Sequence, residues 1–275
     1  MKMKKFSIFL QIVIAFFAVY SCIPGNANLV DPSISGPRII TKIDSSNVMK
    51  QEFISNNSGV LQQVKFSSGE YQNISYNGNN KISKITSYEG TTIEAEWQLS
   101  YDANNRLYKV EQTDYLNSAF HSFIEYLYTY NSANQITHID SITSFALGGG
   151  TGSFYGVIDY TYSGNNIVKA VENSNAIING VPEPLDPITE KSIIFENFDG
   201  KINPMSTLPK EYLIFISSPS IFTSSILSAS NSLKNTIYAG GTNSTSTSTG
   251  FNYDLQNYPI SDVSGVVKYH YKAIQ

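Results

Sequence analysis

His138 and Asp140 are a pair whose types and spacing could bind a metal ion. Residues two apart on a β-strand point to the same face, so the imidazole and the carboxylate would lie side by side. A metal site normally needs three or four converging ligands, and the sequence offers no evident third ligand beside the distant His121 and His270. The sequence therefore predicts no metal site.

Glu94 and Glu96 form a second pair, of the kind that glycoside hydrolases use. In those enzymes the two carboxyl groups flank the scissile bond, whereas two glutamates on one face of a strand are typical of a solvated surface. Residues 148–156 are rich in glycine, but they lack the spacing of a dinucleotide-binding loop and a hairpin loop is the better interpretation. Other catalytic motifs are absent from the sequence. We therefore predict no catalytic residue and no cofactor, with a glycan-acting enzyme as the least favoured alternative.

Cys22 is the single cysteine of the chain and follows a secretion signal. Residues 1–5 are basic, and Phe6 to Tyr20 is an apolar run of 15 residues, whereas a membrane-spanning helix needs about 20. The sequence Val19-Tyr-Ser-Cys22 resembles the lipobox of bacterial lipoproteins, whose cysteine is acylated and becomes the mature N-terminus. We predict a signal peptide at residues 1–21, lipidation of Cys22 and a tether at residues 22–47, with a first strand at Arg38–Ile43. An ordinary signal peptide with an unmodified cysteine is the alternative.

The predicted acyl chains would hold the protein on a membrane, because each buried CH₂ group contributes about 0.8 kcal/mol. No second long apolar run follows Tyr20. The sequence therefore predicts a protein of the cell envelope, anchored at the outer membrane, whose side of the membrane is left open.

The elements that must position any site come from a phrase that occurs four times. Each copy has a tyrosine, four mostly small polar residues, a fifth position and an aliphatic residue: Tyr76–Ile82, Tyr101–Leu107, Tyr130–Ile136 and Tyr162–Val168. Asn, Asp and Gly tolerate left-handed backbone angles, so each copy predicts a tight turn. The runs between the turns alternate, as where Ala95, Trp97 and Leu99 share one face. The sequence predicts an all-β fold, an antiparallel meander of repeated hairpins that forms a curved sheet or a partial or closed barrel.

Residues 205–230 depart from this alternation. Leu208, Tyr212 and Phe215 fall at helical spacing, and Pro219 would end a helix. We expect a short helical insert that covers an open end of the sheet. The Ser- and Thr-rich residues 240–250 are expected to form a flexible loop. Because the repeats continue without a linker, residues 48–275 are predicted to form a single domain.

The spacing between the copies indicates where a ligand would bind. The return path grows from 19 residues (Ile82 to Tyr101) to 23 (Leu107 to Tyr130) and 26 (Ile136 to Tyr162), while the turns keep a constant length. All growth therefore lies on one rim, and in repeat folds such a rim is often the one that binds. Flat rings there could stack on a sugar or a peptide. The candidate ligand-binding rim consists of Tyr115, Phe120, His121, Phe154 and Tyr155, and the alternative is that these rings cap the core.

The net charge and the amino-acid composition limit the classes of partner that the protein could bind. The net charge is −4 with a pI of about 5.4, and no basic stripe is present, which argues against nucleic acid as a partner. Charged residues make up 15% of the chain, below the roughly 25% of average proteins. The 19 tyrosines and 15 phenylalanines are enough to build the hydrophobic core of a β domain.

Several of these features together resemble a family of Bacteroidetes-type lipoproteins of unknown function. They are the lipobox, the Tyr-Asp-x-x-Asn turns, Asn203-Pro-Met205, Ser228–Asn231, the turn at Tyr253–Pro259 and Tyr269-His-Tyr271. The resemblance covers residues 53–273 and implies a porin-like antiparallel β fold with turns similar to YD repeats. The family implies no catalytic residues. Charged residues such as Glu94, Lys109 and Asp159 within the strands would need a wet face, so the resemblance does not imply a membrane-embedded sheet.

Asp140-Ser-Ile142 resembles the Asp-Ser/Thr-aliphatic signal for O-glycosylation in the same bacterial group, which makes Ser141 a candidate acceptor. For the function as a whole, we expect a lipid-anchored β module that binds a glycan, a peptide or a protein. A structural or assembly component of the envelope is the rival hypothesis.

Overall fold

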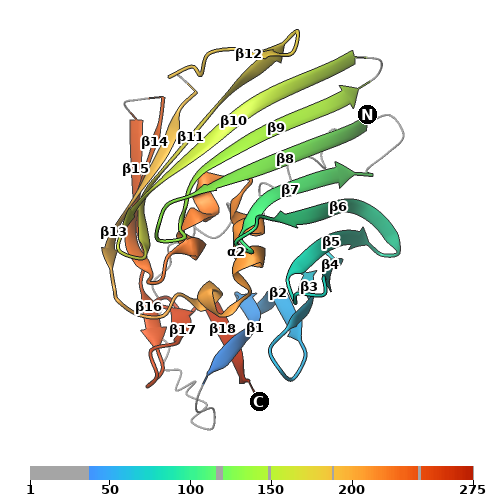
Figure 1. The fold of residues 1–275 in the computed structure, drawn as a ribbon. Helices are drawn as coiled ribbons and strands as arrows, with labels where there is room; N and C mark the ends of the chain where they lie inside the picture. The colour runs from blue at the N-terminus through green and yellow to red at the C-terminus, as the bar shows by residue number, and fades with distance from the viewer. Residues whose placement is uncertain (1–36, 116–119, 148–149, 188, 241–242, 275) are drawn as a thin grey trace.

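The computed structural model describes residues 37–115, 120–147, 150–187, 189–240 and 243–274, which form one curled sheet around a helical insert (Figure 1). The strands are β1 (Arg38–Ser45), β2 (Val48–Ser55), β3 (Leu61–Phe66), β4 (Glu70–Tyr76), β5 (Ile82–Glu89), β6 (Thr92–Tyr101), β7 (Leu107–Asp114), β8 (Phe120–Tyr130), β9 (Ile136–Leu147), β10 (Gly150–Ser163), β11 (Asn166–Ile178), β12 (Val181–Pro182), β13 (Lys191–Phe198), β14 (Ser232–Ala239), β15 (Asn243–Ser248), β16 (Phe251–Tyr253), β17 (Pro259–Asp262) and β18 (Val267–Ala273). The insert consists of η2 (Pro204–Thr207), α2 (Lys210–Ser217) and η3 (Ile221–Leu227).

Every ladder in the sheet is antiparallel, and β1 to β11 pair in sequence order. β11 also pairs with β13, which leads to β14 and β15, while β1 pairs with β18, which leads to β17 and β16. The two ends of the sheet are thus β15 and β16, which follow each other in the sequence. No ladder between these two strands closes the described sheet; residues 249 and 250 join its ends. The predicted antiparallel meander with a curved sheet and a helical insert is confirmed.

The insert packs against the inner face of the curled sheet and contributes to one shared core. Tyr212 and Phe215 of α2 are buried, and the ring of Phe215 meets Trp97 of β6 edge to face at 5.0 Å. The Tyr212 hydroxyl donates a hydrogen bond of 3.0 Å to the buried Gln72 of β4. These contacts place the insert inside the curled sheet (Figure 1), and Lys210 and Glu211 at the start of α2 contact turns at one opening of the sheet, as expected.

The sheet has two rims with different character. The short-turn rim comprises the connections β2–β3, β4–β5, β6–β7, β8–β9, β10–β11, β13–β14 and β16–β17, together with Pro37 and Ile274 at the ends of the described chain. The long-loop rim comprises the connections β1–β2, β3–β4, β5–β6, β7–β8, β9–β10, β11–β13, β14–β15 and β17–β18.

Three copies of the repeated turn share one geometry at the short-turn rim. Asn80, Asn105 and Asn134 adopt φ values of 57°, 57° and 59°, the left-handed region that asparagine tolerates better than most residues. The predicted constant spacing is wrong for the fourth copy. There Tyr162 pairs with Ile167 rather than with Val168, because a two-residue turn with Gly164 at φ 58° replaces the longer one.

The strand expected at Arg38–Ile43, at the end of the predicted tether, is β1, which runs to Ser45 and pairs with both β2 and β18. One further expectation is wrong. Residues 243–248, expected to lie in a flexible loop, form β15 and pair with β14 along their whole length. The predicted signal peptide and Cys22 lie outside the described residues.

Candidate functional site

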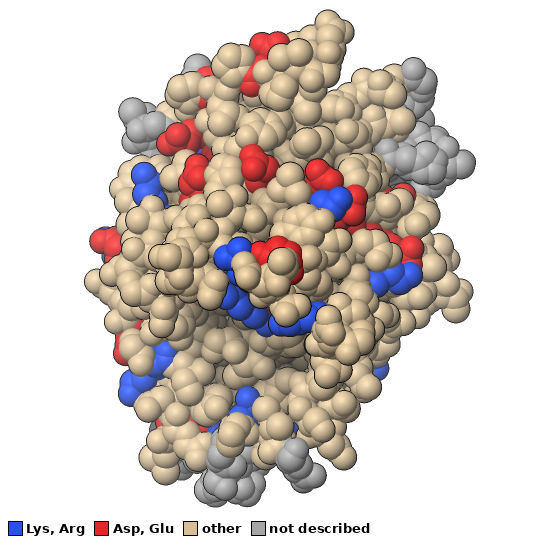
Figure 2. Space-filling view, in the orientation of Figure 1, with Lys and Arg blue, Asp and Glu red and all other residues tan. Residues whose placement is uncertain are grey.

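A small pocket at the short-turn rim lies between three of the repeated turns and the first turn of α2. It has a volume of about 110 Å³ and is lined by Lys81, Asn105, Arg106, Leu107, Tyr130, Asn134, Lys210, Glu211 and Ile214. Figure 2 shows Lys and Arg side chains gathered near the centre of the face on which Figure 1 places α2.

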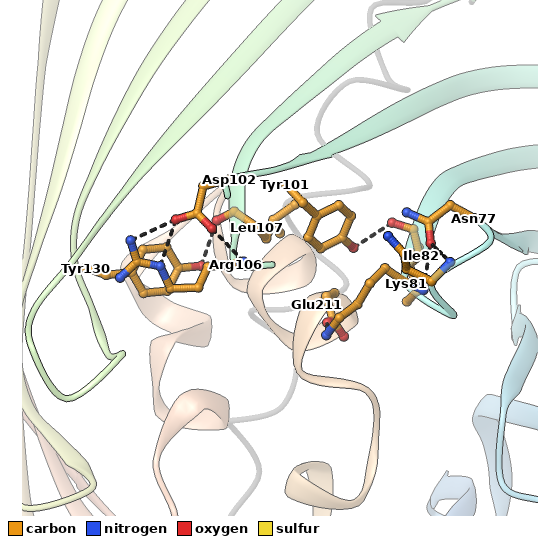
Figure 3. Close-up of polar contacts among 10 residues, drawn as sticks. Asn77, Lys81, Ile82, Tyr101, Asp102, Arg106, Leu107, Tyr130 and Glu211 are labelled. Atoms are coloured by element: carbon orange, nitrogen blue, oxygen red, sulfur yellow. Dashed lines mark hydrogen bonds and ion pairs between the residues drawn. The ribbon is translucent and has the colours of Figure 1, made fainter. Parts of the chain in front are cut away.

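Hydrogen bonds within the turns position two of the cations of this pocket, Lys81 and Arg106. In the first turn, the Asn77 side-chain oxygen accepts hydrogen bonds from the backbone N–H groups of Asn79 (2.9 Å) and Lys81 (3.1 Å). Asp102 does the same for Asn104 and Arg106, both at 2.9 Å. These local bonds fix the backbone of the last turn residue, so Lys81 and Arg106 occupy equivalent positions of the repeat (Figure 3).

The repeat tyrosines lock each turn to the preceding hairpin. Tyr76, Tyr101 and Tyr130 each donate a hydrogen bond of 2.7 Å to the carbonyl of the residue that begins an earlier strand, namely Leu61, Ile82 and Leu107. Burial, with a smaller contribution from Glu211, raises the pKa of Tyr76 to about 12, and burial likewise raises the pKa of Tyr101 and Tyr130. These hydroxyls are therefore fixed donors and not proton-transfer groups near neutral pH.

The charges of the pocket do not balance among its lining residues. Lys81 bonds Glu211 at 2.5 Å, whereas Arg106 bonds Asp102 from Nε at 2.8 Å and lies over the Tyr130 ring at 4.9 Å (Figure 3). The Lys210 ammonium donates only to the backbone carbonyl of Asn134, at 3.0 Å. Since Glu211 pairs with Lys81 and Asp102, outside the lining, pairs with Arg106, the charge of Lys210 is the one left unbalanced.

Lys210 is the cation of this set that lacks a carboxylate partner within the described residues. Partial burial lowers the pKa of Lys210; Glu211 opposes this effect and Lys81 adds to it. An anion placed beside Lys210 would offset the unfavourable burial of its charge. The pocket volume equals about three to four water molecules, so it suits one carboxylate or phosphate group rather than a whole sugar.

The predicted ligand-binding rim is only partly brought together. Tyr115 and Phe154 are 48% and 49% exposed, the Tyr115 hydroxyl bonds Glu96 at 3.3 Å, and Phe154 stacks on Phe145. Tyr155 is adjacent to Phe154 in β10, so the two rings point to opposite faces of the sheet. The Tyr155 hydroxyl bonds Asp140 at 2.8 Å. The side chains of Phe120 and His121 lie outside the described residues.

The other candidates lie in β9, with His138 two residues from the short-turn rim and Ser141 near the middle of the strand. Ser141 of β9 faces Gly156 of β10 and donates to its carbonyl at 3.2 Å, which places the predicted O-glycosylation site between two paired strands. His138 contacts Asp159 at 2.7 Å and Asp140 at 3.2 Å, so both of its ring nitrogens are engaged. Within the described ranges, no group of three or more His, Cys, Asp or Glu side chains could hold a metal ion.

The glutamate pair is tied to neighbouring strands. Glu96 forms an ion pair with Lys84 and accepts a hydrogen bond from Thr86 at 3.3 Å. The hydrogen bond from Lys84 is the largest cause that lowers the pKa of Glu96, although partial burial opposes it. A carboxyl group held ionised in this way is unsuited to the role of a general acid.

A second hollow, of about 240 Å³, lies on the outer face of β11, β13 and β14. Its lining is Lys169, Glu190, Ser192, Ile194 and Tyr238. One cation and one anion balance there, in contrast to the excess of cations at the short-turn rim.

The short-turn pocket was not among the sites predicted from the sequence. A usable signal was present, because the residue before the aliphatic position of the first three repeats is Lys81, Arg106 or Gln135, a long side chain that can hydrogen-bond. The other part of the site, which no sequence signal indicated, is α2. It contributes Lys210 and Glu211 from more than 70 residues further along the chain.

No protein-family model matches the chain, and no curated protein matches it. Among the solved structures that match is a porin-like protein from Bacteroides uniformis, with a TM-score of 0.36 and 13% sequence identity, over 85% of this chain and 98% of that chain. No helix in the described ranges is long and apolar enough to cross a membrane. Membership of the lipoprotein family stays a prediction.

Proposed function

We propose that this protein is a lipid-anchored lipoprotein of the cell envelope that acts as a binding module, and that its short-turn pocket binds an acidic group of the ligand. The proposal rests on the unbalanced charge of Lys210, whose ammonium is bonded only to a neutral carbonyl. A carboxylate or a phosphate would balance this charge, as Glu211 does for Lys81 and Asp102 does for Arg106.

The rigidity of the pocket supports binding rather than catalysis. Its walls are turns held by side-chain to backbone hydrogen bonds and by the repeat tyrosines, so little conformational entropy is lost when a ligand binds. No histidine, cysteine, serine or threonine lines the pocket, and its one carboxylate, Glu211, is paired with Lys81.

The proposal is tested by calorimetric titration of the purified protein with inorganic phosphate and with acetate. We expect saturable binding of at least one of the two anions. Replacement Lys210→Gln should weaken this binding at least tenfold, because hydrogen bonds to charged groups contribute about 1.5–3 kcal/mol. Lys169→Gln, in the outer-face hollow, is the matched control and should bind normally. Absence of saturable binding, or equal losses in both variants, would refute the pocket.

The long-loop rim is the second candidate binding surface, favoured by the exposure of Tyr115. Its expected ligand is a glycan or peptide that stacks on flat rings. Replacement Tyr115→Ala would then lower glycan binding without affecting the binding of phosphate or acetate.

The proposed anchor has its own test. Replacement Cys22→Ala should release the protein from the membrane fraction of the cell, because the acyl chains can no longer be attached. A variant protein that stays in the membrane fraction after washing with salt would contradict the lipoprotein assignment.

A further inference from the structure

The described chain enters and leaves the sheet at the short-turn rim. The Ile274 N–H donates to the Pro37 carbonyl at 3.1 Å, and β1 begins at the next residue, Arg38. Cys22 lies 15 positions before Pro37, a distance that the chain spans with at most about 50 Å. An anchor at Cys22 therefore tethers the domain by this rim and not by the opposite one.

The two rims carry opposite charge. In the connections and the strand residues that flank them, the short-turn rim has five cations and four acids, a balance of +1, whereas the long-loop rim has one lysine and seven acids, a balance of −6. The short-turn set is Arg38, Lys81, Arg106, Lys201, Lys210, Asp102, Asp199, Glu211 and Asp254. The long-loop set is Lys191, Glu70, Glu89, Asp114, Glu183, Asp186, Glu190 and Asp262.

Two lysines of the short-turn set and Lys272, which lies next to that rim in β18, are bonded to neutral oxygen atoms only. Lys210 donates to the Asn134 carbonyl, Lys201 donates to the Asn257 side chain at 2.5 Å, and Lys272 donates to the Ser55 carbonyl at 2.7 Å. None of the three forms an ion pair with another described residue. They remain able to pair with anions supplied from outside.

The same rim exposes apolar side chains at its tips. Leu255, in the connection between β16 and β17, is 96% exposed, the highest value among the large hydrophobic residues described. Val60 and Ile274, each 39% exposed, lie at the β2–β3 connection and at the end of the described chain. The long-loop rim also has exposed apolar tips, such as Val181 at 65% and Val263 at 66%, but they lie among acidic residues. Apolar tips between cations are the combination that favours the interface of an anionic membrane.

From these observations we infer that the short-turn rim lies on an anionic phospholipid surface, with Leu255 in the interfacial layer and a lipid phosphate in the pocket beside Lys210. The inference rests on the proposed function of that pocket. The acidic long-loop rim is repelled by the same surface and faces away from it, so the two rims give the domain one orientation on the membrane.

The test uses the mature chain with Cys22→Ala, so that no acyl chain contributes to binding. It is sedimented with vesicles of phosphatidylcholine alone or mixed with phosphatidylglycerol. We expect binding to the mixed vesicles only, with an affinity that falls as salt is added. Each of Lys201→Gln and Lys210→Gln should weaken binding about fivefold, because a lysine near such a surface contributes about 1 kcal/mol. Leu255→Ser should also weaken it, while Lys191→Gln, at the long-loop rim, should not.

Equal binding to both kinds of vesicle, or equal losses in Lys210→Gln and Lys191→Gln, would overturn the inference. Titration with inorganic phosphate separates the two proposals. If phosphate binds in the pocket but mixed vesicles do not bind, the membrane inference fails and the proposed function stands. If neither binds, both fail.

Discussion

The short-turn rim and the long-loop rim differ in how strongly the repeat determines their structure. At the short-turn rim, three turns share the same left-handed asparagine and the same tyrosine hydrogen bond. At the long-loop rim, the connections differ in length, acidic side chains accumulate, and Tyr115 and Phe154 are about half exposed. The repeat therefore determines the structure of the short-turn rim, whereas the connections of the long-loop rim differ from one another.

The difference between the rims indicates where the sequence tolerates change. Each repeated turn makes two contacts, one from its tyrosine to the preceding hairpin and one from its last side chain to the insert, and both restrict its sequence. The loops on the opposite rim meet neither constraint, and extra length there costs little, since doubling a loop costs about 0.6 kcal/mol. We therefore expect substitutions to be far more costly on the side of the insert.

The largest contrast is expected between two aromatic residues. Trp97→Ala removes a buried ring that packs on Phe215 and should lower the free energy of unfolding by about 3–5 kcal/mol. Phe154→Ala, at the long-loop rim, removes a ring that is 49% exposed and should cost about 1 kcal/mol or less. Urea denaturation of both variants measures the difference. Comparable losses would mean that the insert is not the stable centre of the fold.

A smaller contrast isolates the tyrosine hydroxyl. Tyr101→Phe deletes the hydrogen bond to the Ile82 carbonyl and should cost about 1–3 kcal/mol, because a partly buried carbonyl loses its partner. Tyr115→Phe deletes an exposed hydroxyl that bonds Glu96 at 3.3 Å and should change stability by less than about 0.5 kcal/mol. If the two variants unfold at the same urea concentration, the repeat tyrosines fill space rather than join neighbouring hairpins.

The hairpins could be predicted because their causes are local. Asparagine at a fixed offset from tyrosine specifies the turn, and alternation around Trp97 specifies which face is buried. The same reasoning failed at residues 243–248, where a Ser- and Thr-rich sequence was expected to be flexible. Threonine is β-branched and favours strands, and β14 offers it a complete ladder, so tertiary pairing decided the outcome.

The candidate site depends on distant parts of the chain, and periodicity does not reveal such contacts. The ion pair between Lys81 and Glu211 joins residues 130 positions apart, and the Asn134 carbonyl meets Lys210 across 76 positions. We predicted the ligand-binding residues on the loops that lengthen from repeat to repeat, because loop length is the only feature that changes regularly along the repeats. The constant turns carried the cations, but their partner was a helix whose position inside the sheet no local pattern indicates.

The smallest predicted effect concerns the outer face of the sheet, where His138 lies between Asp140 of β9 and Asp159 of β10, toward the short-turn end of these strands. Partial burial lowers the pKa of His138, but the hydrogen bonds to Asp159 and Asp140 outweigh this and the pKa is raised above its ordinary value of about 6.5. A raised pKa in the folded state means that the stabilisation is fully present below pH 6.5 and is lost as the pH rises through the folded-state value. The wild type should therefore lose up to about 1 kcal/mol of stability relative to His138→Gln between about pH 6 and pH 8, measured by urea denaturation. Lys210→Gln, in the short-turn pocket, is the matched control, with a stability difference from the wild type that stays constant over this range. A His138→Gln variant with the same pH dependence as the wild type would show that this cross-strand contact does not stabilise the fold.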